Sequence, residues 1–379
     1  MASDAPLNIL QISHNYQAPF RMVCHQYAQA LNGHRVTTLY LKGKQQDDVE
    51  AGTGGERVIF LDEGSLRGMK LSTVLHVAKL FRREKYDVVI AHRYKAIYIA
   101  GMMSLFFPIK VLLGVAHEHG VFKRFSRSLF VKYICKDMHV IAVSETVKRD
   151  IVECVPALNV QNRISTLNHA LDANLKENLM SRADARTALG LDQDTWYFGT
   201  VGRLVSKKRH EILIDALARS ELFNVRLVLV GGGPQESSLK QQAVRLGLEE
   251  RIVFAGAVND AWRYLKAFDA FVLTSGAEEA FGIVLLEAML AEIPIISSDA
   301  PGPKEVAGDA ALFFASGDAA DLEQQMEKVA GMDRTALDHL TRAGFRRLGT
   351  RFDLAGFRER LWSVSPLARL VNSSSQQVS

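Results

Sequence analysis

The sequence predicts an α/β protein with two domains, each built on a parallel sheet. The chain has 379 residues, which is enough for two separate hydrophobic cores. Short apolar runs alternate with segments of helical spacing, the order expected of repeated βαβ units. Polar or glycine-rich residues follow several of these runs, at the carboxyl ends of strands where open α/β sheets bind ligands.

Composition excludes several classes of protein. Hydrophobic residues make up 48% of the chain and the mean hydropathy is +0.01, which is typical of a globular protein. We find no apolar run of the roughly 20 residues that span a bilayer, and no secretory leader. The three cysteines form no zinc or redox motif, and their odd number suits a reducing cytoplasm. The net charge of +4 suits an anionic partner.

The first half opens with a strand over residues 7–13, a polar loop over 14–20, a helix over 21–31 and a strand over 36–41. This order is typical of a parallel sheet with a ligand at its strand ends. The pattern G-x-G-x-x-G does not follow the first strand, so a nicotinamide-dependent dehydrogenase is disfavoured.

A histidine pair follows a later strand of the first half. Further strands are expected over 58–61, 86–91, 109–116, 140–143 and 164–167, with helices over 71–81 and from Glu145. The strand that ends at Ala116 leads into His117 and His119, which would share one face if it continued. We interpret the pair as an acid/base or a hydrogen-bonding group for a ligand. Packed or solvated histidines are the alternative, and metal binding lacks a third ligand.

A basic amphipathic segment comes next, over residues 121–134. Four cations alternate with aromatic and aliphatic side chains: Lys123, Arg124, Arg127 and Lys132. Such a helix is typical of a contact with an anionic membrane surface. A half-buried helix with a solvated basic edge is the alternative.

The second half begins after a polar connector over residues 173–194. A strand over 196–201 leads into a loop that holds Gly202, Arg203 and Lys208, before a helix that starts near Glu211. Arginine binds phosphate oxygens bidentately and lysine acts as a point charge, so the loop suits a diphosphate. A solvated basic loop is the alternative.

A second glycine-rich strand end and a pair of glutamates follow. The strand over 225–230 ends at Gly231-Gly232-Gly-Pro, where a ligand can approach the backbone. Glu279 and Glu287 lie between strands over 268–274 and 294–297. Eight helical steps would leave the two about 80° apart, so we expect Glu279 in a turn before the helix and Glu287 within it. Two solvated glutamates in an ordinary αβ unit are the alternative.

The last quarter is predicted to hold a proline-stiffened loop over 299–305 and a strand over 312–314. Helices are expected over 321–329, 334–345 and 354–362, and a flexible tail from residue 367.

Taken in order, four of these motifs resemble the large family of retaining glycosyltransferases with the GT-B fold, family four. The motifs are Gly202-Arg-Leu with Lys208, Gly231-Gly-Gly-Pro, the glutamates around Phe281-Gly282, and Pro301-Gly-Pro-Lys-Glu305. The first half resembles the family more weakly, through 140–145, His119-Gly120 and 168–172. The resemblance implies two Rossmann-like domains facing a central cleft. They are an acceptor domain over 1–173 and a nucleotide-sugar domain over 174–350, with a helix over 351–366 crossing back and a flexible tail over 367–379.

The resemblance also implies roles for individual residues. Arg203 and Lys208 would hold the donor diphosphate, Glu279 the donor sugar and Glu287 the ribose. The backbone at Gly231, Gly232, Phe281, Gly282 and Ile283 would contact the donor. His119, or else His117, would bind the sugar from the first domain. The catalytic set would be Glu279, His119, His117, Arg203 and Lys208, with no divalent metal and no other cofactor.

The sequence departs from the family pattern at two places. Gln17-Ala-Pro-Phe20 stands where the family has a Gly-Gly loop, and His169 stands where asparagine or glycine is frequent. The segments 91–95 and 36–41 are similar to those of bacterial lipopolysaccharide-core sugar transferases.

The similarity to the core transferases implies a partner set and a location. The enzyme would transfer glucose from UDP-glucose to lipopolysaccharide core, with retention. It would be cytoplasmic and peripheral at the inner membrane, and would bind no nucleic acid. Alternatives are a GT-B enzyme with a polyprenyl-linked, exopolysaccharide or soluble acceptor, an epimerase, or a non-catalytic sugar-nucleotide-binding protein.

Overall fold

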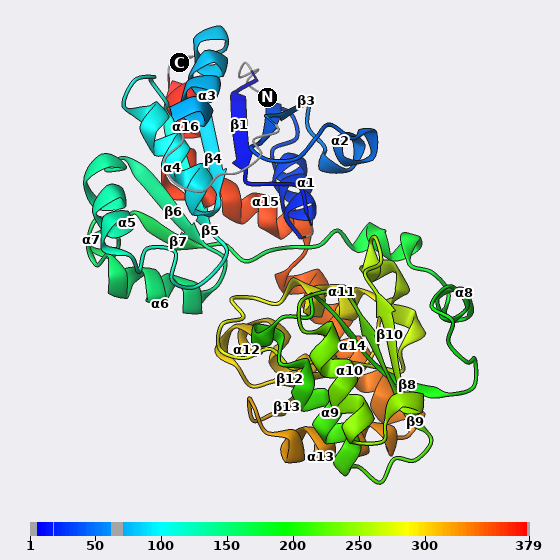
Figure 1. Cartoon of the computed structure of the whole chain (residues 1–379). Coiled ribbons are helices and arrows are strands. Elements are labelled where there is room, and N and C mark those ends of the chain that lie inside the picture. The colour runs from blue at the N-terminus through cyan, green and yellow to red at the C-terminus, as the bar shows by residue number, and fades with distance from the viewer. Residues whose placement is uncertain (1–5, 18, 62–70, 377–379) are drawn as a thin grey trace. The chain divides into compact units, whose positions relative to one another are not determined.

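The computed structural model describes residues 6–17, 19–61 and 71–376, which form two compact units (Figure 1). The first unit comprises Met1–His169 and Leu354–Ser379, and the second comprises Ala170–Asp353. The sequence places the first border at residues 173 and 174, whereas the structure places it four residues earlier, after His169.

The first unit contains a seven-stranded parallel sheet in the order β3-β2-β1-β4-β5-β6-β7. The order reverses between β1 and β4, which creates the ligand crevice of doubly wound sheets at the carboxyl ends of these two strands. The strands are β1 (Asn8–Ser13), β2 (Arg35–Tyr40), β3 (Arg57–Phe60), β4 (Val88–His92), β5 (Val111–Ala116), β6 (Met138–Ala142) and β7 (Ile164–Thr166).

The second unit contains a six-stranded parallel sheet in the order β10-β9-β8-β11-β12-β13. Here the order reverses between β8 and β11, so the loops after these strands lie at the second switch point. The strands are β8 (Trp196–Val201), β9 (Val225–Val230), β10 (Ile252–Gly256), β11 (Ala270–Leu273), β12 (Ile295–Ser298) and β13 (Leu312–Phe314).

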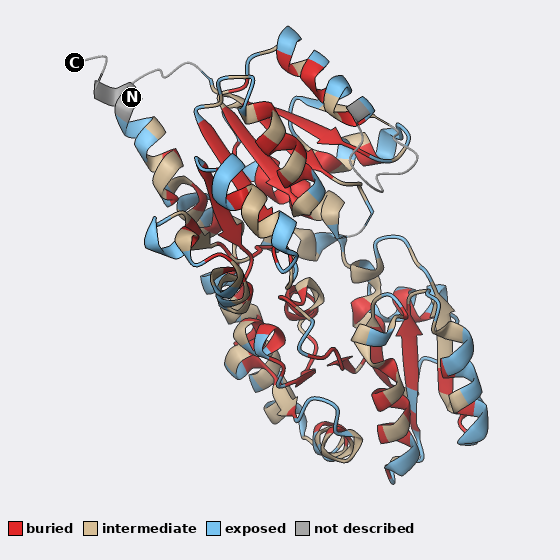
Figure 2. Ribbon diagram, turned by 60° about the vertical axis from the view of Figure 1, so that its left-hand side comes forward, coloured by how far each residue is buried: buried red, intermediate tan, exposed pale blue. Residues whose placement is uncertain are grey.

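Helices flank both sheets, and Figure 2 shows buried strands between helices whose outer faces are exposed. This burial on two faces explains why the strands are near-continuous apolar runs in the sequence. In the first unit the helices are α1 (Phe20–Ala30), α2 (Asp47–Thr53), α3 (Leu71–Arg83), α4 (Arg93–Ser104), α5 (Phe125–Leu129), α6 (Glu145–Cys154), α7 (Ala157–Val160), α15 (Leu354–Ser363) and α16 (Ser365–Gln376). In the second unit they are α8 (Arg182–Ala188), α9 (His210–Arg219), α10 (Glu236–Arg245), α11 (Ile283–Leu290), α12 (Pro301–Ala307), α13 (Ala319–Ala330) and α14 (Arg334–Arg351).

A fully buried arginine fastens the connector to the second sheet. Arg186 on α8 pairs with Asp269 at 2.7 Å and donates to the carbonyls of Ala267, Gln193 and Thr195. These partners compensate for the removal of the guanidinium from water. Part of the polar segment over 173–194 is therefore docked on the domain.

The C-terminal helices α15 and α16 belong to the first unit. The Phe357 and Tyr27 rings lie 5.1 Å apart, and the Trp362 indole donates to the Ala30 carbonyl at 3.2 Å. The prediction of a flexible tail from residue 367 is wrong for residues 367–376. These residues belong to α16, in which Leu367 is completely buried. Apolar residues at spacings of three and four, such as Val364, Leu367 and Val371, give this segment a helical face. Residues 377–379 of the predicted tail lie outside the described residues.

Two other segments differ from expectation. The proline-rich segment over 299–305 is largely the helix α12, because Pro301 occupies a first-turn position, where its missing N–H costs nothing. The basic segment over 121–134 is not one amphipathic helix. Residues 121–124 are not helical, and α5 follows them and leads into a π-helical turn over Phe130–Ile134.

Candidate functional site

An ion pair joins two neighbouring strand ends of the second unit. Lys208 follows β8 and Glu279 follows β11, and the Lys208 ammonium lies 2.6 Å from the Glu279 carboxylate. Both side chains are largely buried, with exposed fractions of 16% and 14%. The Thr274 hydroxyl donates to the Lys208 carbonyl at 2.7 Å, which ties the same two loops through the backbone. The predicted residues Lys208 and Glu279 are thus brought together.

The charge of Lys208 determines the ionisation of Glu279. Burial alone would raise the pKa of Glu279, but the ammonium and its hydrogen bond outweigh burial, and Lys207 adds to their effect. The pKa of Glu279 therefore lies below its ordinary value. At neutral pH the side chain is a carboxylate, which accepts hydrogen bonds from hydroxyl groups.

Glu287 has the opposite shift. It lies within α11, and burial raises its pKa to about 7, with Lys208 opposing the rise and Asp260 adding to it. A carboxyl group with this pKa is both acid and carboxylate near neutral pH, so it can donate to one hydroxyl and accept from another. The predicted placement is confirmed, because Glu279 precedes α11 and Glu287 lies inside it.

The start of α11 has no side-chain cap. Gly282 precedes the helix with a φ of 85°, a left-handed conformation that favours glycine. The first N–H groups of an α-helix have no partner within the helix, and they suit a phosphate or a sugar oxygen. Phe281 is buried beside this turn, and Ile283 is the first helical residue.

The glycine-rich loop after β9 packs directly on the loop after β8. A Cβ atom at Gly231 would collide with the Gly202 carbonyl, and the Gly231 N–H donates to the Gly256 carbonyl at 2.7 Å. A further hydrogen bond of 3.0 Å runs from the Leu204 N–H to the Gly232 carbonyl. Arg203 is exposed on the loop that these contacts hold.

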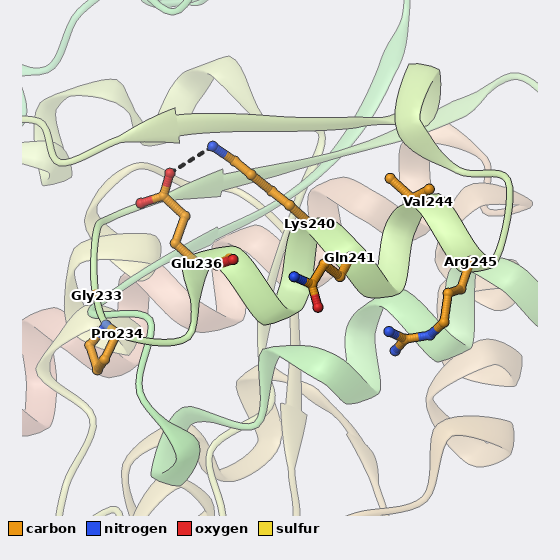
Figure 3. A pocket seen from close by; sticks show the side chains of 8 residues that line it. Gly233, Pro234, Glu236, Lys240, Gln241, Val244 and Arg245 are labelled. Carbon is orange, nitrogen blue, oxygen red and sulfur yellow. Dashed lines mark hydrogen bonds and ion pairs between the residues drawn. The ribbon is translucent and has the colours of Figure 1, made fainter.

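An open groove of about 860 Å³ lies along α10. It starts at Gly233 and Pro234, and Figure 3 shows Lys240 directed toward Glu236, with which it pairs at 2.8 Å. The rest of its lining belongs to α10, from Glu236 to Arg245. The groove adjoins the glycine-rich loop but is lined by neither of the residues of the buried ion pair.

The first unit contains a chain of histidines at the switch point of its sheet. The His92 Nδ1 and His117 Nε2 atoms lie 3.1 Å apart, and the His117 Nδ1 and His169 Nε2 atoms lie 3.4 Å apart. The histidine chain ends inside the sheet, where the His92 Nε2 atom lies 3.2 Å from the Gln11 side-chain oxygen. The rings of His117 and His169 are stacked, with centroids 5.3 Å apart.

The partners of Gln11 fix the direction of this chain. Its amide nitrogen donates to the Cys24 carbonyl at 3.0 Å, so its oxygen faces His92 and His92 carries a proton on Nε2. His92 Nδ1 must then accept from His117 Nε2, and His117 Nδ1 from His169 Nε2. Burial lowers the pKa of His92 to about 3 and that of His169 to about 4, and that of His117 lies well below its ordinary value. All three rings are therefore neutral.

The two predicted histidines have different environments. The expectation that His117 and His119 share a strand face is wrong, because β5 ends at Ala116. Both ring nitrogens of His117 form hydrogen bonds within the histidine chain. His119 lies half-buried in the following turn. Sequence reasoning missed Gln11 and His92 as members of this cluster. His92 carries a signal, since it ends a buried strand at the ligand edge.

In the basic segment of the first unit, one cation contacts neighbouring residues and the other three are exposed. The Arg127 guanidinium lies 4.1 Å from the Tyr94 ring centroid and donates to the Val121 carbonyl at 3.1 Å, so it supports the local fold. The other predicted cations, Lys123, Arg124 and Lys132, are exposed. Phe125 and Tyr133 are exposed with them, at 77% and 62%.

Within the described part of the chain, no three His, Cys, Asp or Glu side chains gather as metal ligands do. In the same residues, no helix combines the length and the apolar character needed to cross a membrane.

Two family models match the chain. Residues 22–174 match the model described as Glycosyltransferase Family 4, and residues 181–343 match that described as Glycosyl transferases group 1. Among known proteins, the chain is 35% identical over 170 residues to the lipopolysaccharide core biosynthesis glycosyltransferase LpsD of Rhizobium meliloti. It is 31% identical over 169 residues to LpsE of the same organism. Each alignment covers 44% of this chain and 48% of the relative, so the chain spans about half the length of these relatives.

A solved structure confirms the predicted GT-B fold. The crystal structure of Anabaena Alr3699/HepE in complex with UDP and glucose has a TM-score of 0.79 at 21% identity. The match covers 94% of this chain and 98% of that protein. The two parallel Rossmann-like sheets described above are thus the two sheets of this fold.

The buried neutral histidines predict that acid destabilises the first unit selectively. The pKa of His92 is lowered to about 3, and those of His139 and His169 to about 4, so the unfolded chain takes up protons below about pH 6.5 that the folded unit excludes. Their contribution to stability is complete above pH 6.5 and is lost as the pH falls toward 4. In the second unit, His210 acts in the same direction, but Glu287, with its raised pKa, gains stability between pH 7 and pH 4.5.

Calorimetry at pH 7.5 and pH 5.0 tests this expectation. We expect the transition of the first unit to fall by the larger amount, with a loss on the order of 1–2 kcal/mol for each buried histidine. A His139→Gln variant should show a smaller dependence on pH. Equal shifts of both transitions would contradict the prediction.

Proposed function

Because the chain belongs to the family 4 and group 1 glycosyltransferases, we propose that it transfers a hexose from a nucleotide-sugar to lipopolysaccharide core, with retention of the anomeric configuration. The observation that carries the proposal is the buried pair of Lys208 and Glu279 beside the exposed Arg203. Two cations and an ionised carboxylate thus lie at the ligand edge of one sheet, as a diphosphate-linked sugar requires.

The chemistry follows from where charge develops. When the bond between the anomeric carbon and the diphosphate breaks, negative charge grows on the leaving group and positive charge on the sugar. Arg203 and Lys208 stabilise the diphosphate, and Glu279 accepts hydrogen bonds from sugar hydroxyls. Glu287, whose pKa is about 7, both donates to and accepts from the ribose hydroxyls. The N–H groups at the start of α11 and the backbone at Gly231 and Gly232 complete the donor contacts.

The donor and acceptor are proposed from the similar proteins. The Anabaena protein is in complex with UDP and glucose, which supports UDP-glucose as the donor. LpsD and LpsE act in lipopolysaccharide core biosynthesis by their names, which supports a core acceptor. His117 is engaged on both ring nitrogens, so we propose His119 for the contact with the donor sugar.

Replacing Arg203 should remove most of the transferase activity. We expect Arg203→Ala to lower kcat/KM by about 10²–10³, the usual effect of losing one group that stabilises transition-state charge. Arg245→Ala is the matched control, because this exposed arginine lies on α10 within the groove. The assay uses UDP-, GDP- and ADP-hexoses, and NMR of the product reports the anomeric configuration. Near-normal turnover of Arg203→Ala would exclude its diphosphate role, and donor binding without turnover would favour a sugar-nucleotide-binding protein.

The reaction is proposed to need no divalent metal, because Arg203 and Lys208 supply the positive charge that a metal ion otherwise supplies. We expect turnover to be unchanged after dialysis against EDTA. Activity that is lost in EDTA and restored by magnesium or manganese would overturn this part of the proposal.

We propose that the exposed basic and aromatic side chains of the first unit bind the cytoplasmic face of the inner membrane. Lys123, Arg124 and Lys132 supply charge, and Phe125 and Tyr133 supply apolar contact. Each basic residue near an anionic surface contributes about 1 kcal/mol, and an aromatic anchor adds the second signal that stable attachment needs.

Co-sedimentation with phosphatidylglycerol vesicles tests the membrane surface. The variant Phe125→Ser with Lys123→Gln and Arg124→Gln should lose at least tenfold in affinity. Phe223→Ser is the matched control, because Phe223 is 82% exposed in the second unit. Unchanged binding of the triple variant would discard this surface.

A further inference from the structure

Four basic side chains follow three adjacent strands of the first sheet. His14 follows β1, Lys42 follows β2, and Arg93 and Lys95 follow β4 in the first turn of α4. The order β2-β1-β4 makes these strands neighbours, and all are parallel, so their carboxyl ends lie side by side. We call His14, Lys42, Arg93 and Lys95 the basic edge.

The four groups are close enough to affect one another. The pKa of His14 is lowered to about 4, most by half-burial and then by the charges of Lys95, Arg93 and Lys42, in that order. The imidazole is therefore neutral beside three cations. Its Nδ1 atom is buried and has no hydrogen-bond partner among the described residues.

This position is unfavourable for cations unless an anion is present. The N-terminus of a helix carries partial positive charge, which disfavours Arg93 and Lys95 in the first turn. The preceding residue, His92, provides no side-chain cap for α4. Arg93 also has a left-handed backbone with a φ of 69°, which is strained for a residue with a side chain. Strained backbone clusters at active sites and ligand clamps.

The neighbours of Arg93 offset only part of this charge. Glu118 lies 3.3 Å from the guanidinium, and the Phe20 ring lies beneath it at 4.9 Å. The Glu118 side chain is 49% exposed, and the Arg93 side chain 32%, so the pair faces solvent and is weak. The lysines of the basic edge are exposed as well.

We propose that the basic edge binds a phosphate group carried by the acceptor saccharide. An arginine, two lysines and an imidazole are groups that bind phosphate oxygens. The donor diphosphate has its own partners, Arg203 and Lys208, in the second unit. The assignment to the acceptor rests on the proposed transferase function, whereas the affinity for phosphate does not.

Titration of the full chain with glucose 6-phosphate, followed by NMR or calorimetry, tests the site without needing turnover. The probe variant is Lys42→Gln with Lys95→Gln, which removes two exposed charges and leaves the strained Arg93 in place. The matched control is Lys79→Gln with Lys85→Gln, two exposed lysines of the first unit, on α3 and just before β4. Thermal melting confirms that both variants fold.

We expect the probe variant to lose at least tenfold in affinity for glucose 6-phosphate, whereas the control variant should bind it as the native chain does. Glucose, which lacks the phosphate, should not bind at this site in the native chain or in either variant. Equal affinity for glucose and glucose 6-phosphate would overturn the proposal, and so would unchanged affinity in the probe variant.

Phosphatidylglycerol vesicles distinguish the source of the phosphate. A probe variant that keeps its affinity for glucose 6-phosphate and loses vesicle binding would assign the basic edge to lipid headgroups and overturn the saccharide assignment. Absence of transferase activity in the native chain would defeat the proposed function, while the titration would still report on the phosphate site.

Discussion

The second unit depends on the contact between Lys208 and Glu279. Removing two charges from water costs several kcal/mol for each ion, and the 2.6 Å pair offsets that cost only if both partners stay in place. Loss of either partner would leave a buried charge, at about 3–5 kcal/mol. The pair therefore holds the loops after β8 and β11 in one arrangement, and it leaves two of the three ammonium hydrogens of Lys208 for a ligand.

The charged groups at the ligand edges of the two sheets have different partners. In the second unit a carboxylate accompanies the buried lysine. In the first unit the histidine chain is neutral, and the basic edge gathers Arg93, Lys95 and Lys42 with the exposed Glu118 as a weak partner. The exposed Arg203 on the same loop as Lys208 adds a positive charge that the Glu279 carboxylate does not balance. An edge with excess positive charge gains stability when an anion arrives.

The sequence predicted the strands well because parallel strands covered on both faces must be apolar along most of their length, as β4 is up to His92 and β9 is apart from Arg226. It also placed Glu279 before a helix and Glu287 within it, because eight helical steps would have left the two about 80° apart. It did not reveal the histidine chain, because Gln11, His92 and His169 are far apart in sequence and meet only through the strand order. Nor did it show that Arg127 stacks on Tyr94, since a stacked arginine and a solvated one have the same local pattern.

The pKa values of Glu279 and Glu287 could not be inferred from their spacing in the sequence. Both are largely buried and both feel Lys208, yet the pKa of Glu279 is lowered and that of Glu287 is raised to about 7. The difference is contact: Glu279 receives a hydrogen bond from the ammonium, whereas for Glu287 burial outweighs the more distant charge. Helical geometry already argued against a paired acid and base. The opposite shifts suit the different tasks proposed for the two carboxyl groups, because an ionised group accepts hydrogen bonds beside a developing positive charge. A group that titrates near pH 7 matches hydroxyls that both donate and accept.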